Sequence, residues 1–309
     1  MLHYIPHLRP IALNNIHDIP AILSEHINDG ATSSSAFLTE ADIPSVLDPY
    51  DCPEFHSTTI HVLNTDALTA AVTILDKSGN EDDEDEIPMN KTIVLNSCSD
   101  ERPGGAYAAL LEPQPATAGN ETPPSSPATE ERKYPLQPIS LEESLCLCTT
   151  LYTTLHKSWY PWPNIGENCV RGIYSPGVVI FRNPKNLELI TEHEERHVVS
   201  MLSISAPYKR PLDPCGTQFR DAKDLEYLRR KLRFWLRVAA MNGQERLVLG
   251  AWGCGTRGCP NREVAEEMRR ALEEKEFKGW FREVVFAIKD FNGEGNYDLF
   301  KKVLEGVVI

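Results

Sequence analysis

Short apolar runs alternate with amphipathic stretches along most of this chain, and the alternation constrains the fold more than any other feature. Runs rich in β-branched residues predict strands at 58–64, 91–96, 177–182, 197–205, 246–252 and 282–289. Stretches with helical periodicity predict helices at 65–75, 141–155, 222–242, 262–274 and 297–305. Strands that alternate with helices predict a largely parallel sheet with helices on both faces. The first such unit, strand 58–64, helix 65–75 and strand 91–96, is expected to be a β-α-β unit.

Two segments interrupt this pattern. Residues 76–90 contain a run of like charges, which is typical of an exposed acidic loop. Residues 112–138 are rich in Pro, Ser, Thr and Glu, a composition that predicts a disordered insertion. We therefore expect an irregular or helical N-terminal extension over 1–56, followed by one α/β domain over 57–309 that carries both interruptions.

The charge of the chain limits its partners. The formal net charge of −14 disfavours a protein that binds nucleic acid sequence-specifically or binds a membrane by neutralising many phosphates. No targeting segment or apolar membrane span is visible, which predicts a soluble protein of the cytoplasm or nucleus. The eight cysteines lack the paired spacing of a zinc site, so Cys254 and Cys259 with Cys215 are not expected to bind a metal.

A glycine-rich loop follows the strand at 246–252. Residues 253–258 read GCGTRG, a G-x-G-x-x-G pattern between a predicted strand and a predicted helix. Such a loop suits a diphosphate, because glycines allow close approach and the helix start offers N–H groups. A dinucleotide-binding Rossmann fold needs more β-α units after the loop than this chain has left. The alternative is that the glycines only permit a tight turn.

A second loop of the same kind follows the strand at 91–96. That strand ends at Asn96, and Pro103, Gly104, Gly105 and Ala106 lead into a predicted helix. Two such loops at the carboxyl edge of one parallel sheet suit a ligand with a central diphosphate and a sugar on each side.

The segment PISLEESLC carries two adjacent glutamates, Glu142 and Glu143. Ser140 and Glu143 match the S-x-x-E capping box, which by itself explains the segment as a helix start. Neighbouring residues on a helix point in different directions, so the glutamates are not the facing pair of most glycosidases.

Six ordered motifs resemble the microbial-type poly(ADP-ribose) glycohydrolases, a branch of the macrodomain superfamily. They read VLNSCSDERPGGAY, LEESLCLCTTLY, IYSPGVVIFR, VVSMLSISAP, LVLGAWGCGTRG and EVVFAIKD, and they span roughly residues 57–290. The resemblance implies a three-layer α/β/α macrodomain with an ADP-ribose cleft at the carboxyl edge of a mostly parallel sheet. It implies no cofactor and no metal, with ADP-ribose or ADP-ribosylated macromolecules as partners.

The resemblance also assigns roles by position. Gly104, Gly105 and Ala106 stand at the family's triple glycine, and Leu141, Glu142 and Glu143 stand at its Gln-Glu-Glu. Glu143 is then the general acid and base at the ribose anomeric carbon, and Glu142 a ligand of ribose hydroxyls. Asn96 is expected to contact a ribose. The second diphosphate loop comprises Gly253, Cys254, Gly255, Thr256, Arg257 and Gly258.

Three positions depart from the family pattern. Ala106 replaces a glycine, Leu141 replaces a glutamine, and Arg257 stands where an aromatic residue is common. The backbone at residue 106 is expected to approach the ligand closely, so a β-carbon there restricts both the turn and the fit. Arg257 is expected to pair with phosphate or stack on a sugar or base. Two functions remain open, an ADP-ribosyl glycohydrolase and a module that binds ADP-ribose without cleaving it.

Overall fold

The computed structural model describes residues 8–77, 91–112, 140–290 and 293–309. The predicted acidic loop and insertion lie almost entirely outside these residues. The described strands are β1 (Ala36–Thr39), β2 (Ile60–Leu63), β3 (Thr92–Ser97), β4 (Arg171–Ile180), β5 (His197–Ile204), β6 (Arg246–Leu249) and β7 (Glu283–Ala287). The described α-helices are α1 (Leu8–Glu25), α2 (Ala67–Lys77), α3 (Tyr107–Leu111), α4 (Leu141–Cys148), α5 (Ala222–Met241), α6 (Asn261–Leu272) and α7 (Asn296–Leu304).

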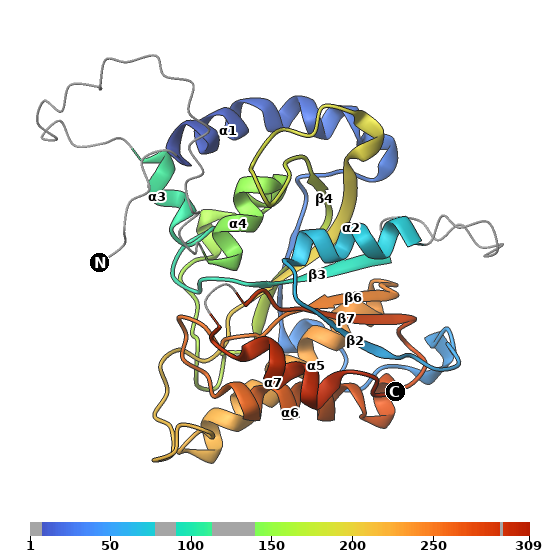
Figure 1. The fold of residues 1–309 in the computed structure, drawn as a ribbon, viewed down its shortest axis with the longest axis vertical. Helices are drawn as coiled ribbons and strands as arrows, with labels where there is room; N and C mark the ends of the chain where they lie inside the picture. The colour runs from blue at the N-terminus through green and yellow to red at the C-terminus, as the bar shows by residue number, and fades with distance from the viewer. Residues whose placement is uncertain (1–7, 78–90, 113–139, 291–292) are drawn as a thin grey trace, which may run out of the picture.

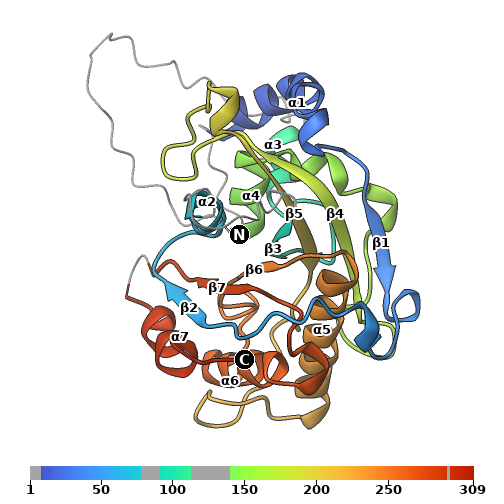
Figure 2. The same ribbon diagram turned by 90° about the vertical axis from the view of Figure 1, so that its right-hand side faces the viewer.

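The strands form one sheet in the order β1-β4-β5-β3-β6-β7-β2, which Figure 2 shows from one edge to the other. The pairs β5–β3, β3–β6, β6–β7 and β7–β2 are parallel, whereas β4 runs antiparallel to both β1 and β5. The sheet is therefore mostly parallel, as predicted.

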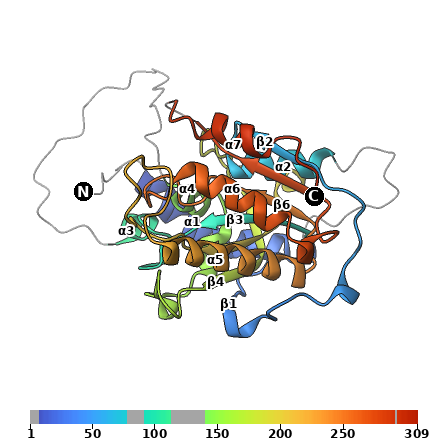
Figure 3. The ribbon, with the colours of Figure 1, turned by 90° about the horizontal axis from the view of Figure 1, so that it is seen from below.

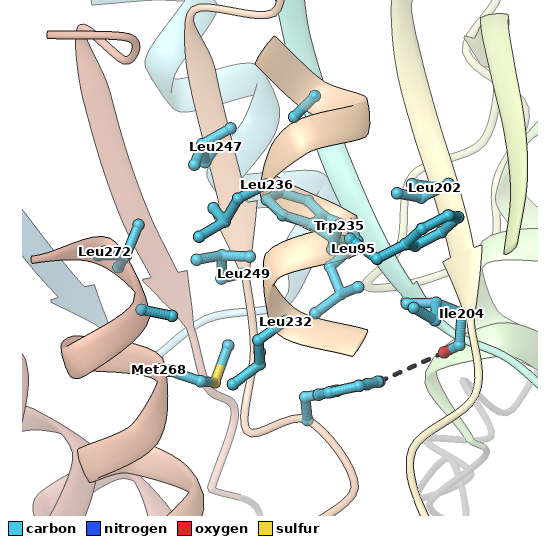
Figure 4. Packing of buried hydrophobic residues seen from close by; sticks show 14 of the residues in the cluster. Leu95, Leu202, Ile204, Leu232, Trp235, Leu236, Leu247, Leu249, Met268 and Leu272 are labelled. Carbon is cyan, nitrogen blue, oxygen red and sulfur yellow. Dashed lines mark hydrogen bonds between the residues drawn. The ribbon is translucent and has the colours of Figure 1, made fainter. Parts of the chain in front are cut away.

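Helices cover both faces of the sheet, which confirms the predicted three-layer α/β/α architecture. Helices α1 to α4 lie on one side and α5 to α7 on the other (Figures 1 and 3). Strand residues alternate between two cores: Val94 packs with α2 and α4, whereas Ile93 and Leu95 pack with α5 and α6. Figure 4 shows the second core, where Leu95, Leu232 and Trp235 meet between the sheet and α5.

The predicted β-α-β unit is only partly correct. Strands β2 and β3 are parallel members of the sheet with α2 between them in sequence, but β6 and β7 separate them in space. Strand β2 lies at an edge because β7 is its partner, in the register Ile60 to Val284. Local periodicity identifies the elements and carries no information about which strand pairs with which.

Residues 8–56 contribute to the sheet and to one helical layer. Strand β1 adds an antiparallel edge to β4, with Ala36 opposite Tyr174. Helix α1 buries Leu8 and Ala12 in the core that contains α3 and α4. Among the described residues, no helix is long and apolar enough to cross a membrane.

Candidate functional site

The parallel strands β3, β5 and β6 are each followed by a loop at the carboxyl edge of the sheet, where these strands end. These loops are residues 98–106, 205–210 and 250–260. Because β3 pairs with both β5 and β6, the loop that follows β3 lies between the other two. Both glycine-rich loops predicted from the sequence thus leave the same edge, as expected from the parallel strands.

The loop after β3 needs glycine at two of its three candidate positions. Gly104 and Gly105 have φ values of +67° and +55°, which L side chains rarely adopt. A β-carbon at Gly105 would lie 2.9 Å from Oε2 of Glu142, and one at Gly104 would lie 2.9 Å from the ring of Tyr152. The backbone therefore passes close to the glutamate segment with no room for a side chain.

Ala106 is compatible with this loop. Its φ of −76° and ψ of −14° are helical values, and it is the residue immediately before α3. The loss of a third glycine therefore places no strain on this turn. This departure from the family pattern does not distort the backbone.

Glu142 is the buried glutamate of the pair. Its side chain is 3% exposed, and its Oε2 accepts a hydrogen bond of 2.7 Å from the backbone N–H of Ser99. Burial raises the pKa of Glu142 to about 8, despite opposing effects from the Ser99 N–H and from Arg257. Its second oxygen, Oε1, is buried with no hydrogen-bond partner among the described residues.

Glu143 is half-buried and participates in the helix cap. The backbone N–H of Ser140 donates to Oε2 of Glu143 (3.2 Å), and the Glu143 N–H donates to Oγ of Ser140 (3.3 Å). The predicted capping box at the start of α4 is thus confirmed. The carboxylate of Glu143 is turned toward Ser140, whereas Glu142 contacts the loop after β3. Leu141 is half-buried at the first position of α4 and packs against the core.

The loop 253–258 is tightly held at one end and open in the middle. Gly253 has a φ of +77°, and a β-carbon there would lie 2.7 Å from both Cβ of Ala206 and Sγ of Cys259. Gly255, Thr256 and Gly258 are exposed. A β-carbon at Gly255 would meet no atom within 4 Å. The thiol of Cys254 is directed to the Trp252 carbonyl (3.7 Å).

The guanidinium of Arg257 donates hydrogen bonds to other groups of the protein. Its Nη1 donates to the Ala206 carbonyl (3.0 Å), and its Nη2 donates to the Cys98 carbonyl and to Oδ1 of Asp100 (both 2.7 Å). The guanidinium also lies 5.7 Å from the ring centroid of Tyr208. The sequence predicted a contact with phosphate, sugar or base, and it gave no sign of these three internal bonds.

Asn96, at the end of β3, is fully buried. Its Nδ2 donates to Oγ of Ser203 on β5 (2.9 Å), and its Oδ1 has no hydrogen-bond partner in the described part of the chain. Buried polar atoms normally have partners. Asn96 Oδ1 and Glu142 Oε1 are thus two buried acceptors without a hydrogen-bond partner among the described residues.

Sequence reasoning missed the groups that support these loops. The ammonium of Lys231, fully buried in α5, donates to the carbonyls of Asn164 (2.7 Å) and Ser205 (2.8 Å). Asn164 in turn donates to the Ala206 carbonyl (2.8 Å) and accepts from the Tyr208 N–H (2.9 Å). A lysine on the apolar stripe formed by Leu228, Leu232 and Trp235 was the available signal. Burial lowers the pKa of Lys231 to about 8.

Comparison with solved structures identifies the fold. The poly(ADP-ribose) glycohydrolase of Thermomonospora curvata bound to the inhibitor ADP-HPD is 23% identical to this chain, with a TM-score of 0.68. That alignment covers 95% of this chain and 98% of the bacterial one. This chain has the poly(ADP-ribose) glycohydrolase fold. The enzyme of Deinococcus radiodurans in complex with ADP-ribose is 25% identical, with a TM-score of 0.61 over 88% of this chain and 94% of that one.

The fold comparison confirms the fold that the six motifs implied, that of the poly(ADP-ribose) glycohydrolases. No family model matches the sequence, and no curated protein does so either. The structural likeness extends along almost the whole chain.

Proposed function

We propose that this protein is an ADP-ribosyl glycohydrolase, which cleaves the ribose glycosidic bond of poly- or mono-ADP-ribose. The observation that carries the proposal is the convergence of the Gly104-Gly105 turn, Glu142 and the 253–258 loop at one sheet edge. Solved structures with this fold include a glycohydrolase in complex with ADP-ribose. The glycine loops are proposed to bind the diphosphate through backbone N–H groups.

The two glutamates take different parts in the proposed reaction. Glu143 donates a proton to the glycosidic oxygen while the bond from that oxygen to the anomeric carbon breaks. Its carboxylate then accepts a proton from the water that attacks the anomeric carbon, which yields free ADP-ribose and restores the acid. The Ser140 N–H donates to Oε2 of Glu143 (3.2 Å), so Oε1 is proposed as the oxygen that carries the proton.

Glu142 is proposed to bind the ribose beside that bond. Its pKa of about 8 leaves the carboxyl largely protonated at neutral pH. A neutral carboxyl is able both to donate to and to accept from ribose hydroxyls. The buried, unpartnered Oε1 is the atom available for this contact. Asn96 Oδ1 offers a second acceptor.

The second candidate function is an ADP-ribose-binding module without catalysis. The observation in its favour is the position of Glu143, whose carboxylate is engaged in the helix cap. A binding module needs only the two glycine loops and the ribose contacts, so every other feature of the site suits both candidates.

The deciding experiment incubates the protein with automodified poly(ADP-ribosyl) and mono(ADP-ribosyl) substrates and measures released ADP-ribose. We expect release by the wild type, and a loss of at least ~10²-fold in turnover for Glu143→Gln, which is typical of removing a general acid. Its affinity for ADP-ribose should stay within about tenfold. The control is Glu226→Gln, a change of the same kind at an exposed position on α5. Binding without release by the wild type would favour the second candidate, and full activity of Glu143→Gln would exclude that residue as the acid.

A further inference from the structure

The guanidinium of Arg257 joins three segments that are far apart in the sequence. Its acceptors are the carbonyls of Cys98 and Ala206 and the carboxylate of Asp100. The side chains of Arg257 and Asp100 are 12% and 16% exposed, so water screens this ion pair only weakly. Two of the three bonds go to the same short stretch, residues 98–100, at the exit of β3.

That stretch carries the N–H group that orients Glu142. Ser99 lies between the two acceptors of Arg257 Nη2, and its backbone N–H donates to Oε2 of Glu142 (2.7 Å). The carbonyl of Asp100 accepts a further bond from the Trp162 N–H (3.0 Å). The Ser99 peptide is therefore fixed on both sides, and its direction sets the position of the Glu142 carboxyl.

We propose that Arg257 and Asp100 form a latch, an ion pair that holds residues 98–100 over Glu142 and thereby positions that carboxyl. Both are positioning residues in this proposal, and Arg257 is not the ligand of the diphosphate. The consequence for catalysis rests on the function proposed above. The consequence for the geometry and ionisation of Glu142 does not.

The latch positions the Glu142 carboxyl through the Ser99 N–H, and it also acts on that carboxyl electrostatically. The charge of Arg257 lowers the pKa of Glu142, against the larger effect of burial, which raises it. Glu143 from α4 is the other charged side chain that acts on this carboxyl, and it raises the pKa. Cys98, Cys146 and Tyr160 lie close enough that the charge of Glu142 raises their own pKa values. Arg257 is the cation that acts on this carboxyl, so its removal should raise the Glu142 pKa further.

Three changes separate position from charge. Arg257→Met removes both the bridging bonds and the cation. Arg257→Lys keeps the cation, but an ammonium cannot reproduce the planar fork that reaches the Cys98, Asp100 and Ala206 acceptors together. Asp100→Asn removes the partner charge. The control is Arg230→Met, which breaks the guanidinium–carboxylate pair of Arg230 with Glu40. No hydrogen bond is described between this pair and residues 98–100.

The test measures turnover, ADP-ribose affinity by calorimetry, the thermal midpoint, and the titration of Glu142 by NMR of carboxyl-labelled protein. We expect Arg257→Met, Arg257→Lys and Asp100→Asn each to lower turnover by about 10²-fold, the size of effect expected from misplacing a catalytic group. Arg257→Met with Asp100→Asn should be no worse than either change alone, because both break one unit. Arg257→Met should raise the Glu142 titration midpoint, and Arg257→Lys should restore it without restoring turnover.

The opposite pattern would overturn the latch. If Arg257 binds the diphosphate instead, Arg257→Met lowers ADP-ribose affinity, whereas Asp100→Asn leaves both affinity and turnover unchanged. A wild type that releases no ADP-ribose would refute the proposed hydrolase function but not the latch. The Glu142 titration and the affinities of the single and double variants for ADP-ribose would still test the latch. A fall in the thermal midpoint with an unshifted Glu142 titration would reduce the pair to a structural bridge and contradict the proposal.

Discussion

Gly253 and Gly255 lie two residues apart and differ in whether the backbone and its neighbours leave room for a side chain. Gly253 combines a φ of +77° with neighbours that leave no room for a β-carbon, whereas Gly255 faces open space. We expect Gly253→Ala to lower the free energy of unfolding by about 1–3 kcal/mol, because strain and contact both oppose the side chain. Urea denaturation measures this effect.

Gly255→Val should show the complementary behaviour. The fold has space for the valine side chain, so stability should change little. The proposed diphosphate would share that space, and therefore ADP-ribose affinity should be lost. Calorimetry on the folded variant checks the expectation, with Ser33→Val as a control at an exposed loop position. Unchanged affinity in Gly255→Val would contradict the assignment of this loop to the diphosphate.

Glu142 and Lys231 make stability depend on pH in opposite ways. The pKa of Glu142 is raised by burial from 4.5 to about 8, so the stability it contributes is lost as pH rises through that window. The pKa of Lys231 is lowered by burial from 10.5 to about 8, so its contribution is lost as pH falls from 10.5 toward 8. A tenfold change in the proton affinity of a group on folding corresponds to about 1.4 kcal/mol, which makes several kcal/mol the upper limit for either residue.

These two windows predict a stability minimum near pH 8 for this pair of groups. The measurement is the free energy of unfolding of the wild type minus that of a variant, followed across pH. With Glu142→Gln this difference should fall between pH 4.5 and 8, and with Lys231→Met it should rise between 8 and 10.5. A difference that stays constant across its window would show that the group is not buried as described.

At the scale of elements, the sequence predicted most helices and strands and misjudged where one helix ends. A helix was expected over 141–155, but α4 ends at Cys148. Thr149 is extended there, with a φ of −138°, because it forms a β-bridge with Ile180 and its hydroxyl accepts from the Leu151 N–H. That bridge is a tertiary contact, and helical periodicity alone contains no trace of it.

Some features of the candidate site could likewise be predicted from the sequence, and others could not. The glycine loops and the capping box were predictable, because their chemistry lies in adjacent residues. The internal bonds of Arg257 were not, because its acceptors at Cys98, Asp100 and Ala206 are brought together only by the order of β3, β5 and β6. The burial that separates Glu142 from Glu143 likewise depends on the loop that packs over α4. The roles proposed for both glutamates remain predictions.

At the scale of the whole molecule, the N-terminal segment is tied to the layer that carries the glutamates. Helix α1 packs on α3 and α4, and its Asn15 is fully buried at that contact. Asn15 Nδ2 donates to the Leu147 carbonyl in α4 (2.8 Å), and its Oδ1 accepts from Nε of Arg182 (2.7 Å). One amide thus connects α1, α4 and the segment after β4.

Replacing this amide should destabilise the whole molecule. Asn15→Leu removes the acceptor of a guanidinium that is 9% exposed and leaves the Leu147 carbonyl without its donor. We expect a loss of about 2–4 kcal/mol in the free energy of unfolding, since breaking a buried charged hydrogen bond leaves its partner unsatisfied. Asn14→Leu is the matched control, because Asn14 is exposed on the same helix. Urea unfolding compares the two variants. Equal stability would show that α1 is an appendage to the domain, whereas a loss confined to Asn15→Leu would show that residues 8–25 belong to its cooperative core.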